Sequence, residues 1–154
     1  MSPAEFKTRR QGLWLSDSDL ATRLGVADAR TIRYWESGRN DIPAKATQEL
    51  VEIEALIKAA VDMFVKFIST KKPKQIALLR YRSETDMVSN EVANFGHPAH
   101  KLHANTLHRI MNIMVGQGIE AGIVYFDPEK YRLWLDGRED RQELRAEWAA
   151  RELK

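Results

Sequence analysis

The sequence predicts a mainly α-helical protein with a small α+β part. We expect an N-terminal domain of four to five helices, followed by a small βαβ-like C-terminal domain. Capping residues and glycines divide the first part of the chain into three short helices, and only two later stretches have strand composition. With 154 residues, 44% of them apolar, the chain is long enough to form two small folded domains.

Each of the three short N-terminal helices has a capping residue in front of it. The helices are expected at about residues 3–12, 17–24 and 29–37. The residues placed to cap them are Ser2, Ser16 and Asp28. Glycines that can take a left-handed conformation are placed to end the second and third helices, at Gly25 and Gly38.

A fourth, longer helix begins at Pro43 and carries an apolar stripe at alternating spacings of three and four residues. The stripe consists of Leu50, Ile53, Ile57, Ala60, Phe64 and Phe67. Two interpretations stay open: the stripe packs on the core of its own domain, or its distal half also packs on a second subunit. The charges and Pro73 of residues 69–74 predict a linker, which separates a domain at 1–68 from one at 75–154.

The C-terminal domain contains the two stretches with strand composition, residues 76–81 and 119–126. A predicted helix at about 98–115 lies between them, so a βαβ unit with parallel strands is expected. Residues 84–92 are a candidate short helix, and two more helices are expected after Asp127 and Asp140.

Composition limits both the compartment and the chemistry. The chain has no cysteine, so disulfides, thiolate zinc sites and a cysteine nucleophile are excluded. The N-terminus reads as a capped helix rather than a leader, and no run of about 18 apolar residues occurs. We therefore expect a cytoplasmic protein that does not contact a membrane.

Residues 15–43, LSDSDLATRLGVADARTIRYWESGRNDIP, carry a specific motif. It resembles the Cro/C1-type (XRE-like) helix-turn-helix family, and the matching positions are Leu15, Ser16, Leu20, Ala21, Leu24, Gly25, Val26, Thr31, Ile32, Trp35, Glu36, Gly38 and Pro43. The turn is one residue longer than the common pattern, as in the YdiL-like proteins and the autorepressors associated with anti-CRISPR operons. The resemblance implies a DNA-binding transcriptional regulator, a dimeric repressor that reads a palindrome in double-stranded DNA and dimerises through its C-terminal domain.

The resemblance also assigns roles to individual residues. Base readers on the third helix would be Ala29, Arg30, Arg33 and Tyr34. Phosphate contacts would come from Ser16, Ser18, Ser37, Arg39 and Asn40. Structural roles fall to Arg10, which would pair with Glu36, and to Ala21, Gly25, Ile32 and Trp35. Trp14 is expected to pack in the core or between helices, and Asp17 is left out of the DNA contacts because a carboxylate repels phosphate.

Charge is consistent with specific rather than tight non-specific DNA binding. Residues 1–48 contain eight Lys and Arg against six Asp and Glu, and the whole chain has a net charge of +2. Such a weak positive charge predicts weak non-specific affinity and a need for base contacts.

Three alternative functions stay open at this stage. An antitoxin or partner-binding module would capture another protein through the C-terminal domain, and a ligand-sensing regulator would need an apolar pocket there. An enzyme would use its N-terminal half only to target DNA, and its chemistry would come from the C-terminal carboxylates or from the histidine cluster His97, His100, His103 and His108. No acidic residue occupies a matching position, and no catalytic motif is present, so we expect no catalytic residues, metal or cofactor.

Overall fold

The computed structural model describes residues 1–71, 73–90 and 96–153. Helices dominate the described chain, and a small two-stranded parallel sheet is its β part, which confirms the predicted fold class. The chain forms two compact units. The N-terminal unit comprises Met1–Ala60 and Ala93–Asn105, and the C-terminal unit comprises Val61–Val92 and Thr106–Lys154.

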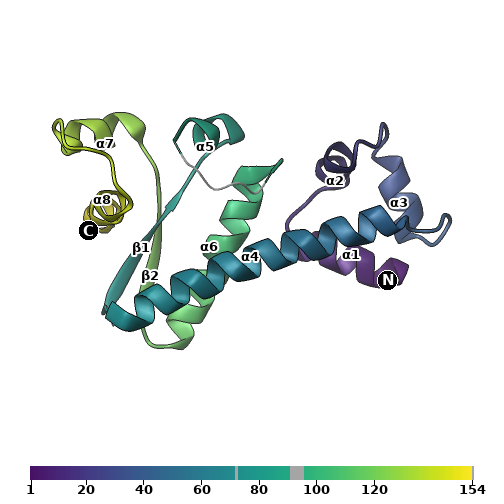
Figure 1. Ribbon diagram of the computed structural model, residues 1–154, viewed down its shortest axis with the longest axis horizontal. Helices are drawn as coiled ribbons and strands as arrows, with labels where there is room; N and C mark the ends of the chain where they lie inside the picture. Colours follow the sequence, from purple (N-terminus) through teal and green to yellow (C-terminus); the bar gives the residue numbers. More distant parts are fainter. Residues whose placement is uncertain (72, 91–95, 154) are drawn as a thin grey trace. The chain divides into compact units, whose positions relative to one another are not determined.

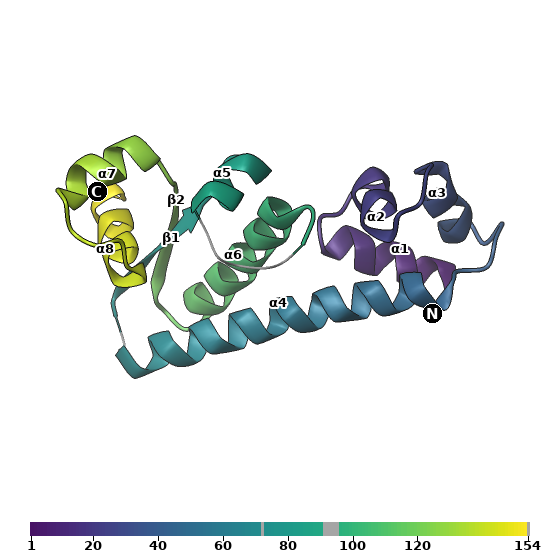
Figure 2. The ribbon, with the colours of Figure 1, turned by 45° about the horizontal axis from the view of Figure 1, so that its top comes forward.

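Four helices build most of the N-terminal unit: α1 (Pro3–Gly12), α2 (Asp17–Leu24), α3 (Arg30–Glu36) and the first half of α4 (Ala44–Lys71). Helix α3 packs against α1 and α2, and Figures 1 and 2 show α2 and α3 together on one side of α1. The predicted caps are confirmed for the first two helices. Ser2 Oγ accepts the Glu5 N–H, and Ser16 and Asp19 form a complete capping box. Gly25 ends α2 with a φ of 69°, a left-handed conformation that glycine adopts without strain.

Apolar side chains from all four helices form the core of this unit. The buried residues are Phe6, Leu13, Leu15, Leu20, Ala21, Leu24, Ile32, Trp35, Leu50, Ile53 and Ile57. The rings of Phe6 and Trp35 meet edge to face, with centroids 6.1 Å apart. Trp14 does not join them, contrary to the prediction, and its side chain is exposed. Residue 14 takes a φ of 61° in the turn after α1, which directs its side chain away from the buried Leu13 and Leu15.

The third helix begins one residue later than predicted. Its first residue is Arg30, the N-cap position is Ala29, and no side chain caps the helix from that position. Asp28 still serves the helix start, because its Oδ1 accepts the backbone N–H of Arg30 at 2.8 Å. The predicted cap therefore acts on the first turn, although it stands outside the N-cap position.

The apolar stripe of α4 follows a different path from the one predicted. Its first three members are buried, but the buried positions further along are Val61 and Ile68, and Phe67 is 50% exposed. An ideal helix repeats every 3.6 residues, whereas the predicted stripe repeats every 3.5, so the predicted stripe drifts around the helix. Over the length of α4 this drift carries Phe67 off the buried face.

The predicted linker at 69–74 begins inside α4. Ser69 Oγ donates a hydrogen bond to the Val65 carbonyl, and Thr70 Oγ1 donates one to the Phe67 carbonyl. These bonds satisfy the two hydroxyls within the helix, so polar residues do not end it before Lys71. The contacts of the structure divide the chain after Ala60, and residues 96–105 group with the N-terminal unit.

The C-terminal unit is built on the predicted βαβ arrangement. Strands β1 (Gln75–Arg80) and β2 (Glu120–Tyr125) pair in parallel, with Gln75 opposite Glu120 and Arg80 opposite Tyr125. The connecting chain includes α5 (Glu84–Asn90) and α6 (Ala99–Gly116), and α7 (Pro128–Leu135) and α8 (Gln142–Glu152) follow β2. In Figures 1 and 2, α6 lies on one side of the sheet and α7 and α8 lie on the other. Part of the candidate helix at 84–92, residues 91 and 92, lies outside the described residues.

An aromatic cluster forms much of the core of the C-terminal unit. Phe126 contacts the rings of Tyr81, Tyr131 and Trp148, with centroids 5.3–5.8 Å apart. All four side chains are buried. The hydroxyl of Tyr131 donates a 2.7 Å hydrogen bond to Asp140, and Asp140 is in turn paired with Arg145 at 2.6 Å. The cluster thus joins β1, α7 and α8.

Alkaline pH is expected to destabilise this unit through Tyr131. Burial, and next the hydrogen bond to the Asp140 carboxylate, raise the pKa of Tyr131 to about 12. Because the unfolded phenol titrates near pH 10, the stabilisation is complete below about pH 10 and is lost as the pH rises towards 12. An ultraviolet absorbance titration should show one tyrosine that ionises near pH 12. Tyr131→Phe should remove that step, and Tyr125→Phe, at an exposed position, should retain it.

None of the helices in the described part of the chain combines the length and apolar character needed to cross a membrane.

Candidate nucleic-acid interface

Helix α3 has one buried and one exposed face. Ile32 and Trp35 are buried in the core of the N-terminal unit. Arg30 and Arg33 of the same helix point outward. The side chains of Arg30 and Arg33 are 68% and 56% exposed. Two of the predicted base readers therefore present guanidinium groups on the free face of a short helix, the arrangement that reading a major groove requires.

Arg30 is held by the carboxylate two residues before it. Its Nε and Nη2 lie 2.7 and 2.6 Å from Asp28 Oδ2. The hydrogen bonds from the Arg30 side chain and backbone hold the pKa of Asp28 below its ordinary value, and Asp28 raises the pKa of Arg30. Asp28 therefore both supports the start of α3 and fixes the direction of its first arginine.

Arg33 belongs to a network of charges that reaches the core. Its Nη1 lies 3.2 Å from Asp17 Oδ2, and the other oxygen of Asp17 lies 3.0 Å from Arg10 Nη2. The buried Arg10 also donates to Glu36 Oε1 at 2.6 Å and to the carbonyl of Leu15. The predicted pair of Arg10 and Glu36 is present, and Asp17 extends it to Arg33. The network ties α1, α2 and α3 together.

The other two predicted base readers are less exposed. Ala29 is half-buried at the N-cap position of α3. Tyr34 is half-buried, and the guanidinium carbon of Arg39 lies 4.5 Å from its ring centroid. The Tyr34 carbonyl accepts the backbone N–H groups of Arg39 and Asn40. Tyr34 thus supports the loop after α3 through its carbonyl group, and Arg39 lies over one face of its ring.

The predicted phosphate contacts lie at two places around α3. Ser16 and Ser18 are exposed at the start of α2, and Ser37, Arg39 and Asn40 are exposed in the loop after α3. The Ser16 hydroxyl already serves the capping box, and the Ser37 hydroxyl donates to the Tyr34 carbonyl at 3.1 Å. Arg39 is the charged member of the set, and it lies next to the exposed face of α3.

The N-terminal unit also uses residues from the second half of the chain. Lys101 Nζ lies 2.6 Å from Asp19 Oδ2, and the buried Asn105 donates to the carbonyl of Gly12 at 2.8 Å. Burial alone would raise the pKa of Asp19, but hydrogen bonds from Lys101 and Ser16 outweigh it and lower that pKa. No local pattern in the sequence indicates these contacts, because each joins residues more than 80 positions apart.

Two of the alternative functions depend on other groups of residues. Among the described residues, no group of three or more His, Asp or Glu side chains could hold a metal ion, so the histidine cluster supplies no such site.

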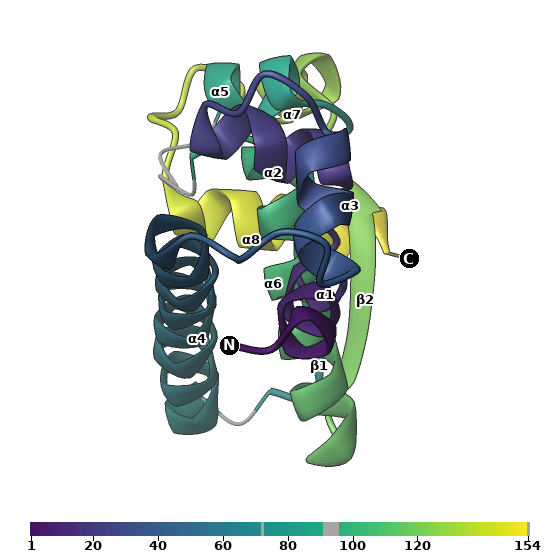
Figure 3. The ribbon, with the colours of Figure 1, turned by 90° about the vertical axis from the view of Figure 1, so that its right-hand side faces the viewer.

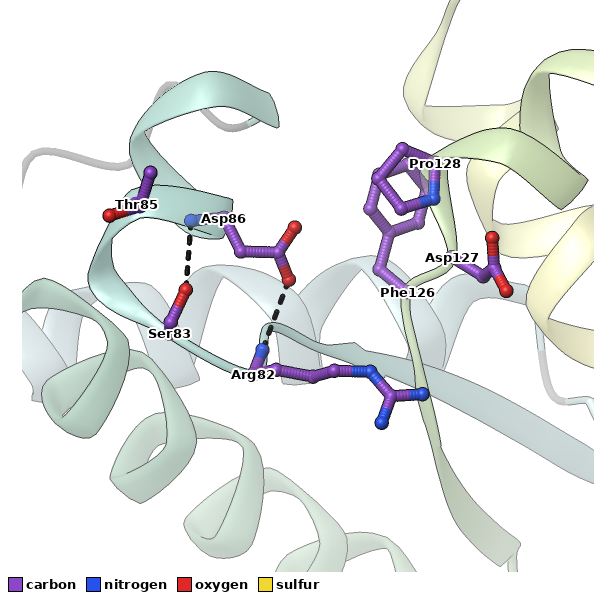
Figure 4. A pocket seen from close by; sticks show the side chains of 7 residues that line it. All are labelled: Arg82, Ser83, Thr85, Asp86, Phe126, Asp127 and Pro128. Carbon is purple, nitrogen blue, oxygen red and sulfur yellow. Dashed lines mark hydrogen bonds between the residues drawn. The ribbon is translucent and has the colours of Figure 1, made fainter.

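An open hollow of about 450 Å³ lies where β1 and β2 end, and Figure 4 shows its lining. Five of its seven lining residues have polar or charged side chains, namely Arg82, Ser83, Thr85, Asp86 and Asp127, and the other two are Phe126 and Pro128.

Helix capping accounts for the main polar groups of this hollow. Figure 4 shows that Ser83 Oγ accepts the N–H of Asp86 and that Asp86 Oδ2 accepts the N–H of Arg82. Asp127 accepts the N–H of Lys130. These polar side chains serve the starts of α5 and α7, and they give no independent sign of a ligand.

Part of the chain is similar to a phage repressor. The chain is 29% identical to the Aca2 repressor of Pectobacterium phage ZF40 over 89 residues, which make up 56% of this chain and 72% of that protein. No protein-family model matches the chain. Together with the three helices of the N-terminal unit, this match supports a repressor-like helix-turn-helix family.

Proposed function

We propose that this chain is a sequence-specific DNA-binding repressor of the XRE-like type, and that α3 reads its operator. The observation that carries the proposal is the pair of exposed guanidinium groups, Arg30 and Arg33, on a helix whose other face is buried by Ile32 and Trp35. An arginine can hold O6 and N7 of guanine with two parallel hydrogen bonds. The similarity to a phage repressor supports a regulator rather than an enzyme.

The two carboxylates beside these arginines favour specific binding. Asp28 and Asp17 hold Arg30 and Arg33 in the free protein, so each guanidinium is already oriented before DNA binds. The same carboxylates repel phosphate and lower the affinity for DNA of any sequence. Guanine offers two acceptors in the right geometry to satisfy a guanidinium, and we therefore expect discrimination to come from bases rather than from net charge.

In this proposal the repressor is a cytoplasmic homodimer on a palindromic site. Two copies of α3 then enter successive major grooves on one side of the duplex, with half-sites about 10 to 10.5 base pairs apart, centre to centre. Occlusion of a promoter, including that of its own gene, is the mode of repression that such binding provides.

A binding titration against DNA from upstream of its own gene tests this proposal. Arg30→Ala/Arg33→Ala should lose roughly 10²- to 10⁴-fold in preference over random competitor DNA, since each bidentate contact is worth about 1 to 3 kcal/mol. Arg132→Ala, which removes an exposed arginine from α7, is the matched control and should keep the preference. Titration at two salt concentrations separates base contacts from phosphate contacts.

Equal, weak and strongly salt-dependent binding by the wild-type and the double-variant chains would contradict the proposal. The partner-binding alternative, in which the C-terminal unit captures another protein, would then take its place.

A further inference from the structure

The first turn of α2 lies beside the proposed base-reading helix and carries two carboxylates. In Figure 3, which looks onto the N-terminal unit, α2 and α3 lie side by side. Asp17 and Asp19 flank the exposed Ser18, and Ser16 precedes them as the N-cap. The hydroxyls of the two serines are the phosphate contacts predicted for this end of α2. A carboxylate on each side of Ser18 would repel a DNA phosphate unless a cation offsets it.

Each of these carboxylates holds a cation, and the two cations lie on different sides of the helix start. Asp17 Oδ2 lies 3.2 Å from Arg33 Nη1 of α3. Asp19 Oδ2 lies 2.6 Å from Nζ of Lys101, which belongs to the first turn of α6. Positions two apart on an α-helix are separated by about 200° around its axis. Arg33 therefore lies on the side of the base readers, and Lys101 lies on the other side of the α2 start.

Lys101 is held in this place by the packing of its own helix. Asn105, four residues later and hence on the same face of α6, donates to the Gly12 carbonyl at 2.8 Å. Before the helix, the carbonyl of His97 accepts a hydrogen bond from Arg23 Nη1 of α2 at 3.1 Å. The start of α6 is thus fixed to α2 and to the end of α1, on both sides of Lys101.

The ammonium group of Lys101 can bind a second partner. It has three N–H donors, and the hydrogen bond to Asp19 uses one of them. The Lys101 side chain is 37% exposed. The same Asp19 oxygen accepts the Ser16 hydroxyl at 2.6 Å, so the ammonium and that hydroxyl meet at one oxygen atom. A phosphate oxygen that approaches Ser16 therefore also approaches Lys101.

We propose that Lys101 contacts a phosphate of the operator at the start of α2, outside the groove that Arg30 and Arg33 read. The inference rests on the proposed function and adds to its interface a residue from the second half of the chain. Phosphates line the edges of the major groove, so a cation on the far side of α2 from the readers is placed for the DNA backbone rather than for bases. Arg39 supplies the charge after α3, and Lys101 supplies it at the start of α2.

The salt dependence of DNA binding by the full chain tests this contact. Lys101→Met should weaken binding to operator and to random DNA by the same factor, roughly five- to tenfold near 0.1 M salt. It should also reduce the slope of log affinity against log salt by about 0.9, the value for one lost phosphate contact. Lys101→Arg keeps the charge and should keep the slope. Lys130→Met, which removes the same charge from an exposed position of α7, is the matched control and should keep it too.

Asp19→Asn separates a phosphate contact from a purely structural role. Asparagine keeps an oxygen for the Ser16 N–H but removes the charge that holds Lys101. If Lys101 contacts phosphate, Asp19→Asn should strengthen binding to any DNA, because one repelling carboxylate is gone and the ammonium is released. If Lys101 serves only to hold α2, Asp19→Asn should weaken binding as Lys101→Met does, and this result would overturn the inference.

An unchanged salt slope in Lys101→Met, or an equal loss of slope in Lys130→Met, would also overturn it. These outcomes are separate from the proposed function. Lys101→Met should keep the preference for operator over random DNA, whereas failure of the proposed function removes that preference from the wild-type chain. The salt slope on random DNA can be measured in either case.

Discussion

Replacing Arg10 with methionine is expected to lower the free energy of unfolding of the N-terminal unit by about 3–5 kcal/mol. Arg10 is buried, and its guanidinium serves Glu36, Asp17 and the carbonyl of Leu15. Methionine keeps most of the length of the side chain but leaves the buried Glu36 carboxylate without its cation. An uncompensated buried charge is costly, whereas the intact pair contributes little net stability.

Arg9→Met is the matched control for this substitution. Arg9 is the neighbouring residue and also has two carboxylate partners, Glu5 and Glu54, but its side chain is 34% exposed. Surface ion pairs contribute little because water and salt screen them, so Arg9→Met should be much milder. Hydrogen exchange of amides in residues 1–60 provides the measurement, since it reports on the N-terminal unit alone.

A second substitution separates the loss of charge balance from the loss of packing. Glu36→Leu added to Arg10→Met should recover part of the lost stability, because it removes the carboxylate that Arg10→Met leaves unpaired. Equal effects of Arg10→Met and Arg9→Met, or no recovery in the double variant, would show that the buried pair does not determine the stability of this unit.

Local signals in the sequence predicted the elements that depend on a few neighbouring residues. Ser2 and Ser16 are followed at the third position by Glu5 and Asp19, and each hydroxyl accepts the backbone N–H expected of it. Pairing of the strands was also predictable, because a strand, a helix and a second strand require a crossover and hence parallel strands.

Other features depend on distances that a local pattern does not contain. The predicted α4 stripe leaves the buried face at its distal end, because a difference of about 0.1 residue in period accumulates to about half a residue over about five turns of helix. Asn105 and Lys101 contact Gly12 and Asp19 of the N-terminal unit, and no periodicity in the sequence marks these contacts. The linker predicted at 69–74 assigns both residues to the C-terminal domain, whereas the contacts of the structure group them with the N-terminal unit.

The candidate interface shows the same division. Arg30 and Arg33 could be named from their place in the motif, and their exposure is that of surface side chains on a helix with a buried face. The role of Asp17 could not be predicted from the motif, because its carboxylate contacts Arg10 and Arg33 only when α1, α2 and α3 are packed together. At sequence level Asp17 counted only as a charge that repels phosphate.

Trp148→Ala is expected to lower the free energy of unfolding of the C-terminal unit by about 3–5 kcal/mol. The Trp148 ring is buried and lies 5.8 and 5.7 Å from the rings of Phe126 and Tyr131, so its removal leaves a cavity between α8, α7 and the end of β2. Trp134→Ala is the matched control. Trp134 stacks on Tyr131 but is only half-buried, so less contact is lost.

The same variant tests how far the two units are independent. If each unit has its own stability, faster hydrogen exchange in Trp148→Ala should be confined to residues 61–92 and 106–153, and residues 1–60 should keep their protection. Because the C-terminal domain is the one expected to dimerise, the homodimer of the proposed function should weaken in parallel, while base discrimination on a single half-site should persist. Equal loss of protection in both units would instead show that they unfold together, and that α4, which runs through both, couples them.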